Sequence, residues 1–143
     1  MLVRELAMDD VSSIGNIYAE AFEHQPETLK FYRIEPYVQF CKDAGYAFVA
    51  EETGKIDGFI LGYERPDIFN GRIAFIELLA VRPDAQKQGY ARKLIERFAE
   101  AARANGIKEL TVATACYKDA YLIYRHLGFM DCQSDMRTLF KRI

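Results

Sequence analysis

Apolar residues recur along the chain with two different spacings. Alternation at every second residue is typical of strands, and recurrence every three to four residues is typical of amphipathic helices. Residues 2–6 alternate, which predicts a first strand. The helical face that follows consists of Val11, Ile14, Ile17, Tyr18, Ala21 and Phe22. Asp9 or Asp10 is expected to cap this helix, because aspartate accepts hydrogen bonds from first-turn N–H groups.

A second helical spacing covers residues 27–42 and ends at Gly45. A break is expected at Pro36, because proline lacks an N–H group. Two segments with strand composition, at 46–52 and 56–63, are joined by a tight turn and predict a hairpin.

A third strand is predicted over residues 72–81, after a turn-rich stretch at 66–71. A long amphipathic helix follows, with a face made of Ala91, Leu94, Ile95, Phe98, Ala101 and Ala102. Arg92 and Glu96 have the spacing of an i,i+4 ion pair, and Asn105-Gly106 ends the helix. The remaining predicted elements are a strand at 109–115, a helix at 118–127 and strands near 129–133 and 136–141.

The predicted order is β-α-α-β-β-β-α-β-α-β-β, which indicates the α/β class with a mixed sheet and helices on both faces. The strands at 72–81 and 109–115 should be parallel, joined by a right-handed crossover. No stretch has the composition of a linker or a repeat, so we expect a single domain over residues 1–143.

The composition excludes several classes of protein. Half of the 143 residues are apolar and 28% are charged, which excludes a disordered chain, a collagen-like repeat and a disulfide-rich miniprotein. The three cysteines, together with His24 and His126, have no metal-ligand spacing, so no metal is predicted. With neither a secretory signal nor an apolar run of about 18 residues, we expect a cytoplasmic protein without membrane or nucleic-acid partners.

Charge is divided unevenly along the chain. Residues 1–60 carry eleven acidic and five basic side chains, whereas residues 61–143 carry ten acidic and fourteen basic ones. The division fits a two-substrate site with one cationic and one anionic ligand, although offsets of this size also arise by chance.

Residues 81–91 are chemically the most informative, because they leave a buried strand and open the long helix. A helix N-terminus carries unpaired N–H groups and partial positive charge, which suit a phosphate. Gly89 lets the backbone approach a ligand closely. The cations in and around this stretch are Arg82, Lys87, Arg92 and Lys93. The stretch is neither a Walker loop nor a dinucleotide fingerprint.

Two motifs stand on either side of one predicted strand. The first is Gln-Lys-Gln-Gly-Tyr-Ala at residues 86–91, which follows Leu79-x-Val81-x-Pro83. The second spans residues 120–129 and contains Tyr124 and, after three intervening residues, Gly128-Phe129. The two motifs resemble the Gln/Arg-x-x-Gly-x-Gly/Ala loop and the Ala-x-x-x-Tyr-x-x-x-Gly-Phe signature of the GCN5-related N-acetyltransferase (GNAT) family. The element order also fits, so the resemblance covers essentially the whole chain.

The resemblance implies an acetyl-CoA cosubstrate that lies where the parallel strands, 72–81 and 109–115, splay apart. Main-chain groups of the splayed strands would bind the pantetheine amides, and the Leu79 N–H would polarise the thioester carbonyl. N–H groups of the loop would hold the diphosphate. The cofactor-binding residues implied in this way are Leu79, Ala80, Val81, Gln86, Lys87, Gln88, Gly89, Tyr90, Ala91, Arg92 and Tyr117.

The resemblance also implies direct attack of a primary amine on the thioester in a ternary complex. Tyr124 stands at the family's acid position and would protonate the departing thiolate; the alternative is an ordinary packed tyrosine. Glu77 interrupts an apolar strand and is the candidate base, acting through water; the alternatives are a salt bridge and an exposed strand-end acid. Strand alternation is expected to place Phe75, Glu77 and Leu79 on one face.

Two positions depart from the family pattern. Tyr117 stands where many members have a cofactor-contacting asparagine, and residues 111–114 lack the carboxylate that some members use as the base. A covalent route through Cys116 lacks a neighbouring histidine in sequence. The aromatic residues of the second helical segment either touch the acceptor or pack in the core; they are Phe31, Tyr32, Tyr37 and Phe40.

The sequence therefore predicts an acetyl-CoA-dependent N-acetyltransferase. The alternatives are a non-catalytic acyl-CoA-binding or regulatory module and an acyltransferase with another acyl chain or acceptor. The acceptor, a small-molecule or peptide amine, is expected to be cationic, because the acidic half of the chain lines the acceptor side in relatives. A homodimer is a further hypothesis, since many relatives dimerise.

Overall fold

The computed structural model describes residues 1–21, 34–114, 119–132, 139 and 141–143. The chain forms two compact units, Met1–Ala113 and Thr114–Ile143. The elements of the first unit are β1 (Leu2–Glu5), the 3₁₀ turn η1 (Met8–Asp10), α1 (Val11–Ala21), α2 (Ile34–Ala44), β2 (Gly45–Glu52), β3 (Lys55–Asp67), β4 (Gly71–Val81), the 3₁₀ turn η4 (Pro83–Ala85), α3 (Tyr90–Ala104) and β5 (Leu110–Val112). The second unit contains α4 (Asp119–His126).

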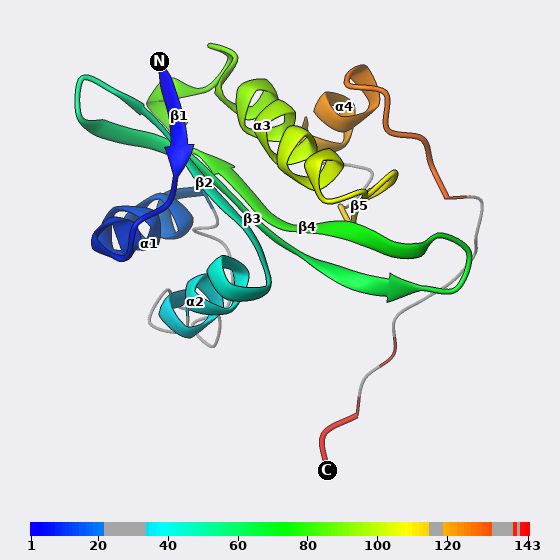
Figure 1. Ribbon diagram of the computed structural model, residues 1–143. Helices are drawn as coiled ribbons and strands as arrows, with labels where there is room; N and C mark the ends of the chain where they lie inside the picture. The colour runs from blue at the N-terminus through cyan, green and yellow to red at the C-terminus, as the bar shows by residue number, and fades with distance from the viewer. Residues whose placement is uncertain (22–33, 115–118, 133–138, 140) are drawn as a thin grey trace. The chain divides into compact units, whose positions relative to one another are not determined.

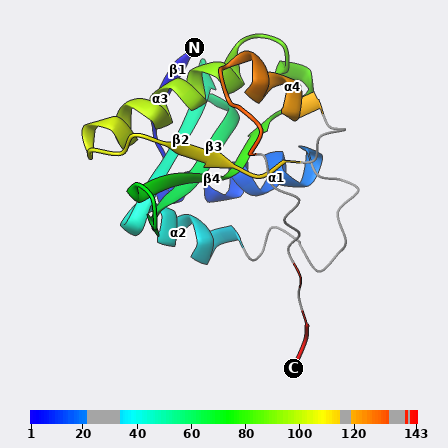
Figure 2. The same ribbon diagram turned by 90° about the vertical axis from the view of Figure 1, so that its right-hand side faces the viewer.

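Within the described residues, five strands form one sheet in the order β1-β2-β3-β4-β5. Neighbouring strands are antiparallel from β1 to β4, and β4 pairs with β5 in parallel. The helices α1 and α2 cover one face of the sheet, and α3 covers the other (Figures 1 and 2). The predicted mixed sheet, with helices on both faces and a parallel β4–β5 pair, is confirmed.

The alternation of β3 produces two apolar layers. Phe59 and Leu61 point toward α1 and α2, where they join a buried cluster that includes Ile14, Ile17 and Val38. On the opposite face, α3 buries the predicted positions Leu94, Ile95, Phe98 and Ala102. The helical spacing read from the sequence therefore identified the buried side of α1 and of α3 correctly.

In place of the predicted helix cap, Asp10 is the third residue of the 3₁₀ turn η1, whose N-cap is Ala7. Its carboxylate accepts a hydrogen bond from the Ala7 N–H (2.8 Å) at the start of the 3₁₀ turn that leads into α1. Arg4 donates to the same carboxylate (2.8 Å) and also reaches Glu51 (3.0 Å). The hydrogen bond from Arg4 holds the pKa of Asp10 below its usual value. This buried acid is therefore fully partnered, which offsets the cost of its desolvation.

The structure corrects several predicted boundaries. Pro36 does not break α2, because it is the third residue of the helix, where an N–H group would have no intrahelical partner. The strand β3 continues to Asp67, whose carboxylate caps the hairpin tip by accepting the Asn70 N–H (2.9 Å). The turn-rich stretch is therefore shorter than predicted, and β5 covers only Leu110–Val112.

The C-terminal strands differ from expectation or lie outside the described residues. Residues 129–132 are neither strand nor helix, although a strand was expected over 129–133. The predicted strand at 136–141 falls mostly outside the described residues, as do Phe22 and the first part of the segment at 27–42.

Gly62 lets α3 lie close against the sheet. A Cβ atom there would stand 2.3 Å from the Phe75 carbonyl oxygen and 2.6 Å from the Phe98 ring. The Phe75 carbonyl oxygen belongs to the backbone of a paired strand and cannot move aside as the end of a flexible side chain can. We therefore expect Gly62→Ala to lower the free energy of unfolding by about 2 kcal/mol. Urea unfolding checks this against Gly58→Ala, whose nearest contact would be 3.1 Å. Equal losses in the two variants would contradict the steric explanation.

Candidate active site

The parallel pairing between β4 and β5 is short. Their parallel ladder begins with the Ala74 N–H, which donates to the Glu109 carbonyl oxygen (3.1 Å), and its last register pair is Ile76 with Val112. The strand β4 continues to Val81, and no described residue of β5 is in register with it beyond Ile76. Among the described residues, this edge of β4 therefore presents backbone groups without ladder partners, as a wedge for an amide-bearing ligand requires.

Glu77 is the extra residue of a β-bulge in β4. Leu61 is in register with Leu78, and the next residue of β3, Gly62, is in register with Ile76. Glu77 therefore has no opposite residue in β3. A bulge of this kind reverses the alternation of the strand beyond it, for backbone groups and side chains alike.

The bulge decides which backbone groups face the wedge. Ala74 directs its N–H toward β5, so in a regular strand Leu78 would also face that edge. The extra residue instead turns the main-chain groups of Leu79 and Val81 toward the wedge. In agreement, the Val81 carbonyl points away from β3 and accepts the Gln86 side-chain amide (3.2 Å). These are the residues whose main chain the sequence motif assigned to pantetheine.

The same bulge corrects the expected side-chain alternation. Phe75 lies opposite Tyr63, on the face covered by α1 and α2, whereas Leu79 lies opposite Ile60, on the face covered by α3. The prediction that Phe75, Glu77 and Leu79 share one face is therefore wrong for Leu79. One inserted residue is enough to exchange the two faces of a strand.

The loop between β4 and α3 turns through two left-handed residues. Lys87 has φ 62°, and Gly89, the N-cap of α3, has φ 89°. The first hydrogen bond of α3 runs from the Lys93 N–H to the Gly89 carbonyl oxygen (3.1 Å). The N–H groups of Tyr90 and Ala91 precede it and have no intrahelical partner. Residues 86–89 are exposed, whereas Ala85 and Tyr90 are buried. Unpaired N–H groups at a helix N-terminus are donors of the kind that bind anions.

The cations near the loop are engaged to different extents. Arg92 pairs with Glu96 (2.8 Å), as the sequence spacing predicted. Arg82 lies beside the buried Asp57, with its Nε 3.5 Å from Oδ1. Lys87 and Lys93 are exposed. Arg82 is therefore held by a protein carboxylate, and the exposed positive charge at the loop comes mainly from the lysines.

Glu77 is exposed on the face of the sheet that carries α2. Burial, and after it the negative charge of Glu77, raise the pKa of the Cys41 thiol to about 12 and also raise the pKa of Tyr63. Cys41 is therefore a neutral thiol at physiological pH. No ion pair of Glu77 is present among the described residues, so the salt-bridge alternative finds no partner there.

Aromatic rings border the Glu77 side of the sheet. The Tyr63 ring lies 5.6 Å from Phe40 and 5.7 Å from Phe75, and Phe40 is 49% exposed. The Arg65 guanidinium stands 4.9 Å from the Phe75 ring centre. Tyr37 has a buried hydroxyl without a hydrogen-bond partner in the described structure. Of the aromatic residues considered from sequence, Phe31 and Tyr32 lie outside the described residues.

Tyr124 is held in the second unit by the end of α4. Gly128 (φ 94°) donates to the Arg125 carbonyl (3.1 Å), and the Phe129 N–H donates to the Tyr124 carbonyl (3.0 Å), which together form a Schellman motif. The rings of Tyr124 and Phe129 pack edge to face, with their centroids 5.3 Å apart. The Tyr-x-x-x-Gly-Phe signature is therefore a helix-ending motif that fixes the tyrosine. Burial raises the pKa of Tyr124 to about 12, so its phenol remains protonated at neutral pH.

Some predicted residues cannot be placed. Tyr117 and Cys116 lie outside the described residues, as does His24, whereas His126 is exposed on α4.

Among the described residues, no three potential ligands lie close enough to hold a metal ion. No helix in this part of the chain is long and apolar enough to cross a membrane.

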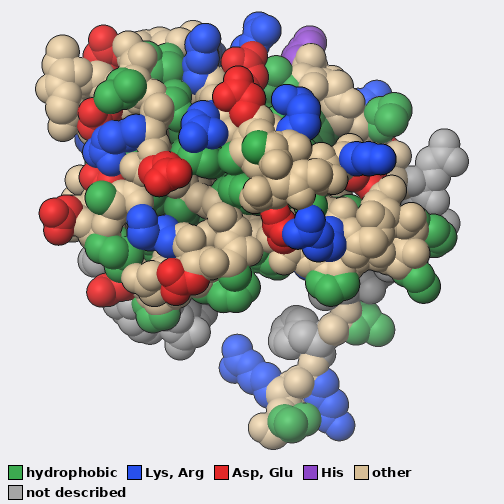
Figure 3. Space-filling view, viewed as in Figure 1, with side chains coloured by type: hydrophobic (Ala, Val, Ile, Leu, Met, Phe, Trp, Pro, Cys, Tyr) green, Lys and Arg blue, Asp and Glu red, His purple; other side chains and the backbone are tan. Residues whose placement is uncertain are grey.

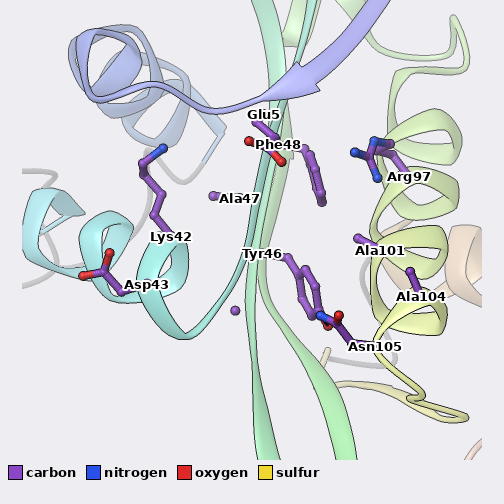
Figure 4. A pocket seen from close by; sticks show the side chains of 11 residues that line it. Glu5, Lys42, Asp43, Tyr46, Ala47, Phe48, Arg97, Ala101, Ala104 and Asn105 are labelled. Atoms are coloured by element: carbon purple, nitrogen blue, oxygen red, sulfur yellow. Dashed lines mark hydrogen bonds between the residues drawn. The ribbon is translucent and has the colours of Figure 1, made fainter.

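A cavity of about 470 Å³ lies elsewhere in the first unit, at the edge of β2 (Figure 4). Tyr46 and Phe48 point toward α3, and Lys42 and Asp43 approach from α2. The Arg97 guanidinium stands 4.4 Å from the Phe48 ring centre. None of the predicted catalytic or cofactor-binding residues lines this cavity, so its lining does not overlap the wedge or the loop.

Comparison with known families identifies the family of this chain. A model of the acetyltransferase (GNAT) family matches residues 11–129. The chain belongs to this family. Its predicted enzyme class, an acetyltransferase, is confirmed by that membership. A search of curated proteins found no match.

Solved structures show that the GNAT chain has the fold of its family. A ribosomal-protein-alanine N-acetyltransferase from Brucella melitensis biovar Abortus 2308 is 20% identical, with 100% of both chains covered and a TM-score of 0.77. Aminoglycoside acetyltransferase meta-AAC0020, from an uncultured soil metagenomic sample and solved with sisomicin, is 20% identical over 99% and 95% of the chains (TM-score 0.77). Aminoglycoside N-acetyltransferase AAC(6')-Iy, solved with CoA, is 19% identical over 99% and 93% (TM-score 0.79).

Proposed function

We propose that this GNAT protein transfers the acetyl group of acetyl-CoA directly to a primary amine in a ternary complex. The observation that carries the proposal is the β4 bulge, which turns the Leu79 N–H into the open wedge and leads straight into the exposed loop before α3. Backbone donors aimed at a thioester carbonyl on one side and at a diphosphate on the other fit one extended ligand, CoA.

The proposed roles rest on the geometry of β4 and on the position of Tyr124 in the family signature. The Leu79 N–H polarises the thioester carbonyl, while the main chain of Ala80 and Val81 binds the pantetheine arm. The amine nitrogen forms a bond to the carbonyl carbon, and the carbon–sulfur bond breaks. The ammonium form first loses one proton to Glu77 through water. Tyr124 protonates the departing thiolate, and the second proton that the nitrogen loses as the amide forms restores the Tyr124 phenol through solvent.

We propose that the acceptor is cationic. Glu77 contributes an exposed carboxylate beside the rings of Phe40, Tyr63 and Phe75, and such a surface attracts an ammonium group both by charge and by cation–π contact. The Arg65 guanidinium already makes a cation–π contact with the Phe75 ring. Basic and acidic side chains are interspersed over the face shown in Figure 3, so the overall charge of that face does not select an acceptor. The aminoglycoside and ribosomal-protein enzymes among the similar structures are consistent with an amine acceptor.

A screen of amines tests the proposal. Release of free CoA from acetyl-CoA is measured with polyamines, aminoglycosides, amino acids and peptides with free N-termini. We expect turnover with at least one cationic amine and slower turnover with propionyl- and succinyl-CoA. A preference for acidic acceptors would reject the cationic assignment, and a hydroxyl acceptor would reject N-acetylation. Binding of CoA without turnover on any acceptor would favour the non-catalytic module.

Gly89 supplies a second test of the cofactor site. A Cβ at Gly89 would meet nothing within 4 Å, but the residue has φ +89°, a conformation that costs alanine about 1–2 kcal/mol. We expect Gly89→Ala to raise the KM for acetyl-CoA about tenfold with little change in kcat, because the loop relaxes away from its donor geometry.

Gly54→Ala is the matched control. Gly54 also has a left-handed φ (+82°) and open space around its Cβ, but it lies in the turn between β2 and β3. Both variants should lose similar thermal stability. An equal rise of the KM for acetyl-CoA in both would show that the loop conformation has no particular role in binding.

Three further expectations remain proposals. We propose that residues 1–143 act as a single domain, that the protein is cytoplasmic and that it forms a homodimer. Size-exclusion chromatography with light scattering measures the oligomeric state. A monomer at all concentrations used for activity assays would reject the homodimer.

A further inference from the structure

Asp57 is a buried acid that the proposed reaction does not use. It is 6% exposed and is the extra residue of a second bulge, in β3, between register pairs that join Gly58 to Ala50 and Ile56 to Glu51. A buried carboxylate is costly unless other groups pair with it. Its partners therefore indicate what it does.

These partners stand at both ends of the loop that precedes α3. At the β4 end, the Arg82 backbone N–H donates to the Asp57 carbonyl oxygen (2.7 Å), and the Arg82 Nε lies 3.5 Å from Oδ1. At the α3 end, the Tyr90 hydroxyl donates to Oδ2 (3.1 Å). Arg82 directly follows β4, and Tyr90 is the first residue of α3. One acid thus connects the two anchor points of the loop.

Two more contacts complete this arrangement. Lys55 Nζ lies 3.8 Å from Asp57 Oδ1, and an Arg82 terminal nitrogen donates to the Ile56 carbonyl (3.1 Å). The Arg82 Nε is buried, forms no hydrogen bond in the described structure, and lies at ion-pair distance from Asp57 (3.5 Å) and from the exposed Asp84 (3.9 Å). Arg82 is therefore fixed to β3, and its distance from β3 sets where the loop begins.

We propose that Asp57 is a positioning residue for the diphosphate of CoA. By holding Arg82 and Tyr90 together, it fixes the span of the loop, so that the N–H groups between them converge on one anion. Binding donors that are displaced by about 1 Å lose much of their contribution, which is why a buried support can control affinity without touching the ligand. The inference rests on the proposed function, because it requires the loop to bind CoA.

Asp57→Asn is the test, with Asp84→Asn as its matched control. Asp84 lies near the same cations, 3.8 Å from Lys55 and 3.9 Å from Arg82, but is 69% exposed. The probes are CoA, titrated calorimetrically, and acetyl-pantetheine, an acyl donor without the diphosphate. We expect Asp57→Asn to raise the Kd for CoA about tenfold. The value of kcat/KM for acetyl-CoA, divided by the value of kcat/KM for acetyl-pantetheine, should fall by the same factor. Asp84→Asn should change both by less than about twofold.

The outcomes separate this inference from the proposed function. Unchanged CoA affinity in Asp57→Asn, or equal losses for acetyl-CoA and acetyl-pantetheine, would overturn the positioning role, because a general structural defect affects both donors. Absence of CoA binding by the unmodified protein would overturn the proposed function itself. If circular dichroism shows that Asp57→Asn does not fold, Tyr90→Phe decides: we expect about threefold weaker CoA binding, and an unchanged Kd would overturn the proposal.

Discussion

Replacement of Tyr124 by phenylalanine is expected to lower kcat at least a hundredfold while changing the Kd for CoA by less than about twofold. A positioned general acid contributes roughly 10²–10⁴ in rate, and the substitution removes only the phenol oxygen. The ring contact with Phe129 and the backbone hydrogen bonds at the end of α4 remain, so the fold should be retained. Steady-state kinetics and calorimetry measure the two quantities.

Tyr121→Phe is the control for this variant. Tyr121 lies on the same helix, and its hydroxyl donates to Asp131 (2.8 Å). Its replacement also removes a single hydroxyl, but at a variable position of the signature, between Ala120 and Tyr124. We expect a change in kcat of less than about twofold. If both variants lose activity equally, the loss reflects α4 as a whole and Tyr124 is an ordinary packed tyrosine.

The acid role also predicts how the defect depends on the leaving group and on pH. Thioesters of more acidic thiols need less protonation on departure, so the Tyr124→Phe defect should shrink with such donors. Because burial raises the pKa of Tyr124 to about 12, its protonated form persists through neutral and moderately alkaline pH. The unmodified enzyme should therefore show no loss of rate from Tyr124 ionisation below about pH 11. A defect independent of the leaving group would contradict the assignment.

Replacement of Glu77 by glutamine is expected to lower kcat/KM for the amine about a hundredfold near pH 7. The acceptor is an ammonium ion at this pH, and the variant lacks the carboxylate that receives its proton. As pH rises toward the pKa of the free amine, the neutral form accumulates without assistance. The variant should then recover most of the difference, which a pH series of kcat/KM measures.

Glu100→Gln controls for the loss of one exposed negative charge. Glu100 is exposed on α3, and its replacement should leave kcat/KM within about twofold at all pH values. Because Glu77 is exposed as well, its substitution should change stability by no more than about 0.5 kcal/mol. A Glu77→Gln enzyme with normal rates near pH 7 would place the base elsewhere.

Much of the fold was predictable because its signals are local. The helical faces of α1 and α3 follow from spacing along the chain, and a residue three or four positions away shares a face in any context. The end of α3 follows from Gly106, which adopts φ 81°, as a C-terminal glycine should. The loop with Gly89 and the Tyr124 motif are likewise continuous segments. Their conformations depend mainly on their own residues.

Features that depend on pairing between distant segments were missed. Glu77 was singled out as an acid in an apolar strand, but the bulge at Glu77 exists only relative to β3 and reversed the predicted orientation of Leu79. Asp57 interrupts an apolar strand with the same kind of signal, yet its role depends on Arg82 and Tyr90, which follow it by 25 and 33 positions in the sequence. Two acids with the same local pattern are thus distinguished by their partners.

By itself, the sequence determined most of the elements of the first unit, the family and the residue types at the loop and at the end of α4, because periodicity and short motifs act within a few residues. Only the tertiary structure decided which backbone groups face the wedge, that Glu77 stands on the α2 side and that Asp57 connects both ends of the loop. Those outcomes depend on strand register and burial. A one-residue shift in register exchanges the faces of a strand, and the chain spacing alone does not fix that register.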